Sequence, residues 1–227
     1  MNWVAGNLDL IWELTVVHLR QSVIAVILGF ALSLPLGWLA WRYRGARGGI
    51  LTVTGLLYTI PSLALLMIIP VILGTAPFNE INLIVALTIY AIALMTRSVT
   101  DGLGSVDPAV RLSATAMGYG AGRRFWAVEF PLAGPVILAG LRVTAVSTIA
   151  LATVGALIGV TNLGYLFTNG SQRRIIPEVL AGIIAVVMIA LVVDGLLIAA
   201  GRVLMPWSRA QRRRARRGTL PLEVSVA

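Results

Sequence analysis

Long apolar segments follow one another along almost the whole chain, at about 19–41, 49–73, 81–95, 132–160 and 176–204. A helix crosses the hydrocarbon core of a bilayer with about 20 predominantly apolar residues. The composition agrees, because 58% of the residues are hydrophobic and 12% are charged, whereas soluble domains have about 25% charged residues. We therefore predict an all-α membrane protein with about five transmembrane helices.

The missing residue types exclude several chemistries. The chain has no cysteine, which excludes disulfides and cysteine-based metal sites. All eighteen basic residues are arginines, so the lysine of a Walker A loop and a Schiff-base lysine are both absent. His18 is the only histidine, and a pair of histidine ligands is excluded. We expect no catalytic residue, no metal site and no cofactor on this chain, so that any ATP hydrolysis takes place elsewhere.

The arginines are distributed unevenly around the apolar segments. If the connection after the first segment lies inside, that side collects fourteen arginines and the other side only two or three. Membrane proteins keep such residues in their cytoplasmic loops, so we predict the N-terminus outside and the C-terminus in the cytoplasm. The net charge of +9 then reflects topology, and we expect membrane lipids but no nucleic acid among the partners.

Residues 98–130 interrupt the apolar pattern with charged side chains. Asp107 directly before Pro108 is typical of the start of a helix. We expect a short cytoplasmic helix here, and the alternative is a solvated loop with an interfacial helix. We expect one transmembrane domain, 1–207, which includes this segment, and an arginine-rich cytoplasmic tail, 208–227.

The segment 107–118, DPAVRLSATAMG, followed by FWAVEFPL at 125–132, resembles the "EAA" loop of ABC importer permeases. That loop reads Glu-Ala-Ala, three residues and Gly, with a hydrophobic-Pro-Leu sequence later. The blocks YTIPSLAL at 58–65 and GLRV at 140–143 look like the glycine betaine/carnitine/choline branch of the same family. The resemblance implies the MetI-like fold of these permeases.

In that family the loop forms a short helix that docks into a groove of the ATPase. Small Ala114 and Ala116 permit close approach, and Gly118 suits a left-handed cap at the end of the helix. Leu112 stands where the family has its acidic residue, which removes a polar contact and adds apolar area. The resemblance implies that these residues couple the chain to the ATPase: Arg111, Leu112, Ser113, Ala114, Ala116, Met117 and Gly118.

Two charged residues lie deep within apolar segments. Arg142 and Asp194 are each roughly 12–16 Å from the predicted inner surface, at about 1.5 Å per residue. Charges at this depth usually pair or face water. We predict an intramembrane ion pair between them, and the alternative is that each side chain snorkels separately to water.

Polar residues on two segments are candidates for the translocation path. Thr144, Ser147 and Thr148 follow one another along the fourth segment, where small polar residues also serve ordinary helix packing. On the second segment the candidates are Tyr58, Pro61 and Ser62. The prolines imply a bent helix. The face of an aromatic ring attracts quaternary ammonium ions, and the alternative for Tyr58 is a packing role.

The resemblance implies a permease subunit of an ATP-driven importer for compatible solutes, in the bacterial inner membrane. The partners it implies are a second permease chain, a cytoplasmic ATPase dimer that carries ATP and Mg²⁺, and an extracytoplasmic solute-binding protein. The alternatives are a permease for an amino acid such as methionine, a stand-alone secondary transporter, which would show internal repeats, and a non-transporting membrane scaffold.

Overall fold

The computed structural model describes residues 2–207, and these residues form helices and connections without a strand. The predicted tail, 208–227, lies outside the described residues. The first half of the chain contains α1 (Asn2–Ala5), α2 (Leu8–Arg42), α3 (Arg44–Thr59), α4 (Ser62–Leu73) and α5 (Glu80–Gly104). The second half contains α6 (Pro108–Ala116), α7 (Ala121–Arg124), a π-helical turn (Phe125–Glu129), α8 (Phe130–Ala152), a 3₁₀ turn (Thr153–Ile158), α9 (Gly164–Gln172) and α10 (Ile176–Leu204).

Four helical stretches are long and apolar enough to cross a membrane: α2, α5, the continuous stretch from Ala121 to Ile158, and α10. The pair formed by α3 and α4 meets the same criteria together, but it is bent by 102° at its break. The described residues therefore contain four spans, or five if the bent pair counts as one. The predicted all-helical fold is confirmed.

The bounds of the helices differ from those of the predicted spans, most clearly in the first three. The first span begins at Leu8, because its polar residues Asp9 and Glu13 are accommodated in the opening turns of the same helix. The third span continues to Gly104. The second span is two helices, because Pro61 has no N–H to continue α3 and holds Ile60 in an extended conformation with ψ of 127°.

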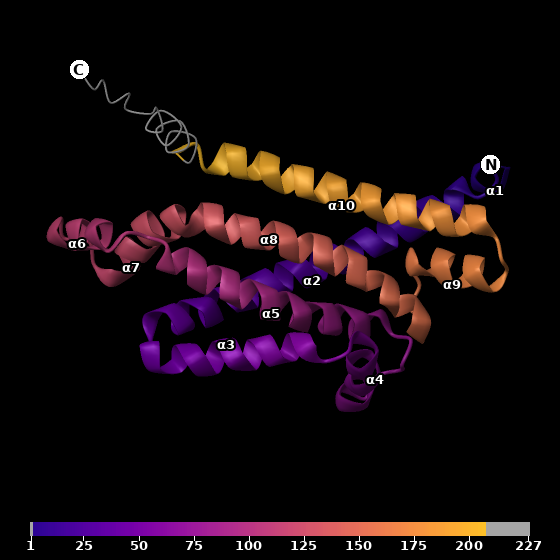
Figure 1. Ribbon diagram of the computed structural model, residues 1–227, viewed down its shortest axis with the longest axis horizontal. Helices are drawn as coiled ribbons and strands as arrows, with labels where there is room; N and C mark the ends of the chain where they lie inside the picture. The colour runs from indigo at the N-terminus through magenta and orange to yellow at the C-terminus, as the bar shows by residue number, and fades with distance from the viewer. Residues whose placement is uncertain (1, 208–227) are drawn as a thin grey trace, which may run out of the picture.

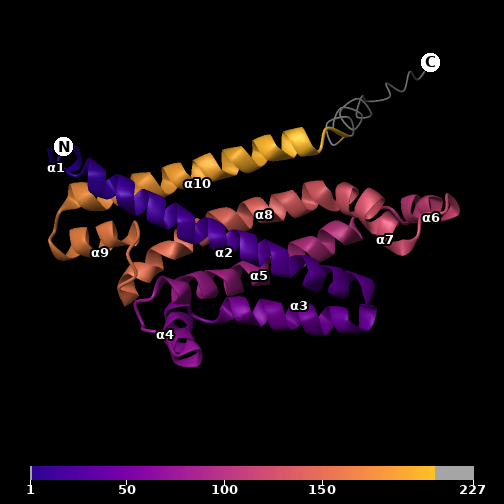
Figure 2. The same ribbon diagram turned by 180° about the vertical axis from the view of Figure 1, so that it is seen from behind.

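Helix α5 lies at the centre of the bundle, between α3 and α8 in both views (Figures 1 and 2). It approaches α2 very closely along two glycines. A Cβ atom added at Gly29 would stand 2.3 Å from Cβ of Ala91, and one added at Gly37 would stand 2.6 Å from Cβ of Val99. Small residues allow this kind of close helix approach in membranes. Helix α10, by contrast, lies at the edge of the bundle (Figure 1).

The elongated bundle has two distinct ends (Figure 1). The α6 end carries α6 and α7, together with the last turns of α2 and α10. The opposite α9 end carries α1, α9 and the helix α4, which projects sideways from the bundle (Figure 2). The short helices thus lie toward the two ends of the bundle.

Candidate functional site

Helix α6 has well-defined caps at both ends. The Asp107 side chain accepts a 2.8 Å hydrogen bond from the N–H of Ala109, and Pro108 occupies the first turn. At the other end Gly118 has φ of 82°, which is the left-handed conformation of a C-terminal cap. Both caps agree with the prediction from sequence. The helix is therefore a defined element rather than a loop.

Arg111 anchors α6 to the bundle. Its Nη2 donates hydrogen bonds to the carbonyl oxygens of Leu103, at 2.7 Å, and Val106, at 2.8 Å. Its guanidinium lies 4.8 Å from the centre of the Trp41 ring, within the range of a cation–π interaction. Arg111 thus joins α6 to the end of α5 and the end of α2, and it points inward rather than toward a partner.

The other predicted coupling residues fall on two sides of α6. Ala114 is buried, which allows the helix to lie close to the bundle. Leu112 is 72% exposed and Met117 is 70% exposed, and both are large apolar side chains. We call the exposed side the outer face of α6; it consists of Leu112, Ser113, Ala116 and Met117. The role of this face in binding a partner remains a prediction.

Arg124 connects α6 to the π-helical turn that leads into α8. Its Nε donates to Oε1 of Glu129 at 2.9 Å, and its Nη1 donates to Oγ1 of Thr115 at 2.8 Å. Glu129 is almost fully buried, and it belongs to the π-helical turn that leads into α8. Turns of this type are frequent at functional sites. Arg124 and Glu129 thus connect α6 to the start of α8.

The structure brings Arg142 of α8 and Asp194 of α10 together. Nε of Arg142 donates to Oδ1 of Asp194 at 2.6 Å, and Nη2 donates to Oδ2 at 2.8 Å. This is the bidentate geometry typical of arginine–carboxylate ion pairs. The pair joins α10, a helix with little burial of its own, to α8. Its contribution to assembly remains a prediction.

The predicted path residues form two separate groups, with α5 between them. Tyr58, Pro61 and Ser62 lie at the break between α3 and α4, where Tyr58 is 46% exposed. Thr144 and Thr148 of α8 are buried, and Thr144 directs its hydroxyl toward Sδ of Met95 in α5. In this conformation both threonines contribute to packing, and the role of the two groups in a path remains a prediction.

A buried polar network at the α9 end was missed from sequence. Nε2 of His18 lies 2.9 Å from the carbonyl oxygen of Ile149. Gln21 donates to the carbonyl of Thr161, and Asn162 bonds both Gln21 and the carbonyl of Ala152. Helix α2 begins ten residues before His18 and buries this ring.

A second buried polar contact joins α9 to α10. Nδ2 of Asn169 donates to Oε1 of Glu178 at 2.6 Å, and Glu178 is fully buried. The signal for both contacts is a polar residue close to an apolar run, which in membrane proteins usually faces the protein interior. Within residues 2–207, no group of three His, Cys, Asp or Glu side chains could hold a metal ion.

Apolar helices long enough to cross a membrane, with a short capped helix exposed at one end, are typical of a multi-pass membrane protein. The chain matches the family described as "Binding-protein-dependent transport system inner membrane component" over residues 29–207. It belongs to this family, whose members are transport components. The chain is therefore the permease subunit of an ABC importer.

Its relatives include permeases of the branch that it resembles. The choline transport system permease protein OpuBB of Bacillus subtilis is 34% identical over 191 residues, which cover 83% of this chain and 86% of that protein. The carnitine transport permease protein OpuCB of Listeria monocytogenes is 37% identical over a region that covers 78% of this chain and 80% of that protein. The osmoprotectant import permease protein OsmW of Salmonella typhimurium is 31% identical over a region that covers 87% of this chain and 93% of that protein.

Solved structures share the fold. The MetNI methionine ABC transporter in an inward facing conformation has a chain that superposes with a TM-score of 0.77 and 20% identity, covering 88% of this chain and 98% of that chain. An amino acid ABC transporter solved with histidines gives a TM-score of 0.68 at 17% identity. At this level of identity the similarity establishes the MetI-like fold alone.

Proposed function

We propose that this chain forms the translocation path of an ATP-driven importer for compatible solutes, and that α6 transmits the work of a partner ATPase. The observation that carries the proposal is the outer face of α6. It presents Leu112 and Met117 to solvent, while Arg111 fixes the same helix to the ends of α5 and α2. A helix that is exposed on one side and anchored on the other is suited to transmit a movement of the ATPase to the transmembrane helices.

The proposed topology places the α6 end in the cytoplasm and the N-terminus outside, in a bacterial inner membrane. The arginines support this orientation, since the ends of α2 and α10, the start of α3, and the segment with α6 and α7 carry most of those in the described part of the chain. Cytoplasmic loops are enriched in such residues. The ATPase, with its ATP and Mg²⁺, would then meet the outer face of α6 from the cytoplasm.

The proposed solutes are glycine betaine, choline, carnitine and proline betaine. The relatives named for choline, carnitine and osmoprotectant transport support this class. A binding protein outside the membrane would deliver the solute, and a second permease chain, identical or related, would complete the path. Rocking of the bundle between inward-open and outward-open states would then move the solute without any chemistry on this chain.

The coupling role is tested by co-purification of the tagged chain with its candidate ATPase in detergent. Met117→Asp places a charge on the outer face and is expected to abolish retention of the ATPase. Gly48→Asp is the matched control, because position 48 lies at the same end, in α3, with open space around it. Leu112→Glu restores the acidic residue of the family pattern and is expected to retain the ATPase.

Failure of the wild-type chain to retain any ATPase would instead favour a stand-alone transporter or a scaffold. The solute class is tested separately, by uptake of labelled glycine betaine, choline and carnitine in cells that lack other importers for them. Competition by unlabelled compatible solutes supports the proposal. Competition by methionine alone would contradict the substrate class and leave the coupling role intact.

A further inference from the structure

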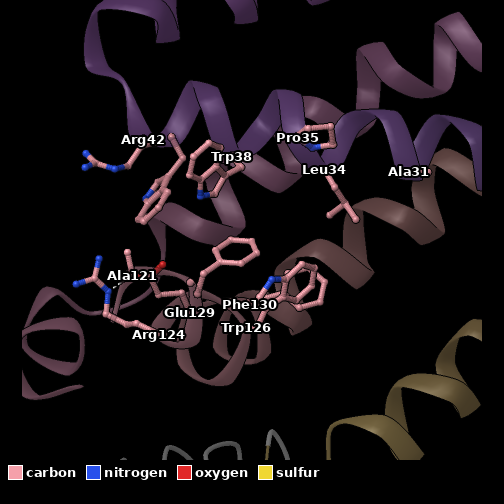
Figure 3. A pocket seen from close by; sticks show the side chains of 13 residues that line it. Ala31, Leu34, Pro35, Trp38, Arg42, Ala121, Arg124, Trp126, Glu129 and Phe130 are labelled. Carbon is pink, nitrogen blue, oxygen red and sulfur yellow. Dashed lines mark hydrogen bonds and ion pairs between the residues drawn. The ribbon is translucent and has the colours of Figure 1, made fainter. Parts of the chain in front are cut away.

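A hollow of about 540 Å³ opens at the α6 end, between the last turns of α2 and the segment that leads into α8. Both sides contribute aromatic rings. Figure 3 shows Trp38 of α2 facing Trp126 and Phe130 across it. The aromatic lining consists of Trp38, Trp41, Phe125, Trp126 and Phe130. Tryptophans are enriched where a membrane protein meets the headgroup region of the bilayer.

The charged groups of the hollow are confined to one of its ends. Arg42 and Arg124 lie together there, whereas Leu34 and Ala31 lie at the other end (Figure 3). The carboxylate of Glu129 is already bonded to Arg124. Arg42 lies over the ring of Tyr43, and no carboxylate of residues 2–207 is within ion-pair distance of its guanidinium. Two arginines and one glutamate leave this end with a net positive charge.

The length of the hollow suits one acyl chain. Ala31 and Arg42 are eleven positions apart on α2, which corresponds to about 16 Å along a helix. Half of the hydrocarbon core of a bilayer is about 15 Å. The apolar end is thus reached by a chain that starts at the level of Arg42 and follows α2 into the membrane.

We propose that this hollow binds one anionic phospholipid of the leaflet on the α6 side. Its phosphate lies at Arg42, next to Arg124, and one acyl chain follows Leu34 and Ala31 along α2. Basic pockets between helices at the cytoplasmic surface are suited to anionic headgroups. Only the assignment of the leaflet to the cytoplasmic side rests on the proposed orientation.

The charges select against a cationic occupant. Aromatic rings alone would also attract a quaternary ammonium ion. In this hollow the arginines at the polar end oppose such an ion, and the one carboxylate is bonded to Arg124. A bound lipid would contact both parts of the chain that line the hollow, α2 and the segment that leads into α8. It would fill the space between α2 and the π-helical turn, and would thereby hold the segment behind α6 in place.

The test uses the purified full-length chain in mild detergent and native mass spectrometry, which gives the dissociation constant of the first bound lipid. Phosphatidylglycerol is compared with phosphatidylcholine of the same acyl chains. We expect a preference for phosphatidylglycerol, and Arg42→Gln is expected to weaken its binding about fivefold, since a basic residue near the membrane surface contributes about 1 kcal/mol. Binding of phosphatidylcholine is expected to stay unchanged.

The matched control is Arg44→Gln, which removes the same charge from an exposed position outside the hollow. It is expected to leave the preference intact. The arginines of residues 208–227 are the same in every variant, so their contribution to lipid binding cancels. Equal losses in Arg42→Gln and Arg44→Gln, or no preference in the wild type, would overturn the proposal.

Two further measurements cover a folding defect and the source of the phosphate. Arg42→Lys keeps the charge and is expected to keep most of the preference, so a loss equal to that of Arg42→Gln contradicts a site built on charge. Glycerol phosphate, which has no acyl chain, is expected not to compete at concentrations where phosphatidylglycerol binds. Equal competition would show that a free phosphate suffices and that the site is not a lipid site.

Discussion

The hydroxyl of Tyr90 in α5 donates a 2.6 Å hydrogen bond to the carbonyl oxygen of Ile60, at the break between α3 and α4. Pro61 follows Ile60 and begins the second arm of the 102° bend. The ring of Tyr90 also meets the ring of Tyr58 edge to face, with centres 5.8 Å apart. Tyr90 therefore joins the central helix to the bend itself.

Tyr90→Phe is expected to loosen this bend, because it removes the hydrogen bond and keeps the ring. The free energy of unfolding should fall by about 0.5–1.5 kcal/mol, the usual net value of one hydrogen bond. The angle should also vary more widely. Spin labels on Cys introduced at Leu56 and Met67, both exposed, report the spread of distances across the break. The natural chain has no cysteine, so the labelling is specific.

Tyr58→Phe is the control for this experiment, since the structure gives the Tyr58 hydroxyl no hydrogen bond within residues 2–207 and the edge-to-face contact is preserved. Its distance distribution should match that of the labelled wild type. A broadening in Tyr58→Phe equal to that in Tyr90→Phe would mean that the ring contact, and not the hydrogen bond, holds the bend.

Gly29→Ala is expected to destabilise the bundle, because the added methyl group would overlap Cβ of Ala91. Overpacking of this kind typically costs about 1–3 kcal/mol. Thermal unfolding in detergent measures the loss. Gly55→Ala serves as control, since position 55 also lies within a helix, α3, and has no atom within 4 Å of the added group. If the two variants unfolded alike, the close approach of α2 and α5 would not be limiting.

Arg142 and Asp194 are expected to depend on each other. Arg142→Gln or Asp194→Asn alone leaves a charge of the partner without its counter-ion inside the membrane. The double variant should therefore be more stable than the sum of the two single losses predicts. Thermal unfolding of all four proteins completes the cycle. Strictly additive losses would mean that the two side chains act independently.

Arg111→Gln is expected to release α6 from the bundle while the spans stay folded. Hydrogen bonds from a charged group contribute about 1.5–3 kcal/mol, and the variant loses those to the carbonyls of Leu103 and Val106. Amide hydrogen exchange in 108–116 should accelerate, with little change in α5 or α8. In Arg123→Gln, where the lost partner is the ring of Tyr119, exchange in α6 should stay slow.

The parts of the fold that depend on local pattern could be predicted from sequence. The last span matches α10, Ile176–Leu204, because a continuous apolar run bounded by polar residues defines a membrane helix by itself. The ends of α6 follow from Asp107 and Gly118, whose side-chain and backbone preferences act within a few residues.

The parts that depend on tertiary contact could not be predicted. The prolines indicated a bend in the second span, but its sharpness involves Tyr90, a residue thirty positions away from Ile60. Arg111 is part of the family motif, yet only the packed structure turns it inward to α5. The polar character of His18, Gln21 and Asn162 favours an interior position, but it does not identify their partners, which lie more than one hundred positions away or across a turn.

The contact between Gly29 and Ala91 has room for a single methyl group, and this chain places it on α5. Positions 29 and 91 are therefore expected to vary together during evolution. A relative with alanine at position 29 should carry glycine at position 91, since the total volume and not either residue is under selection. The reciprocal exchange, Gly29→Ala with Ala91→Gly, should accordingly be tolerated where Gly29→Ala alone is not.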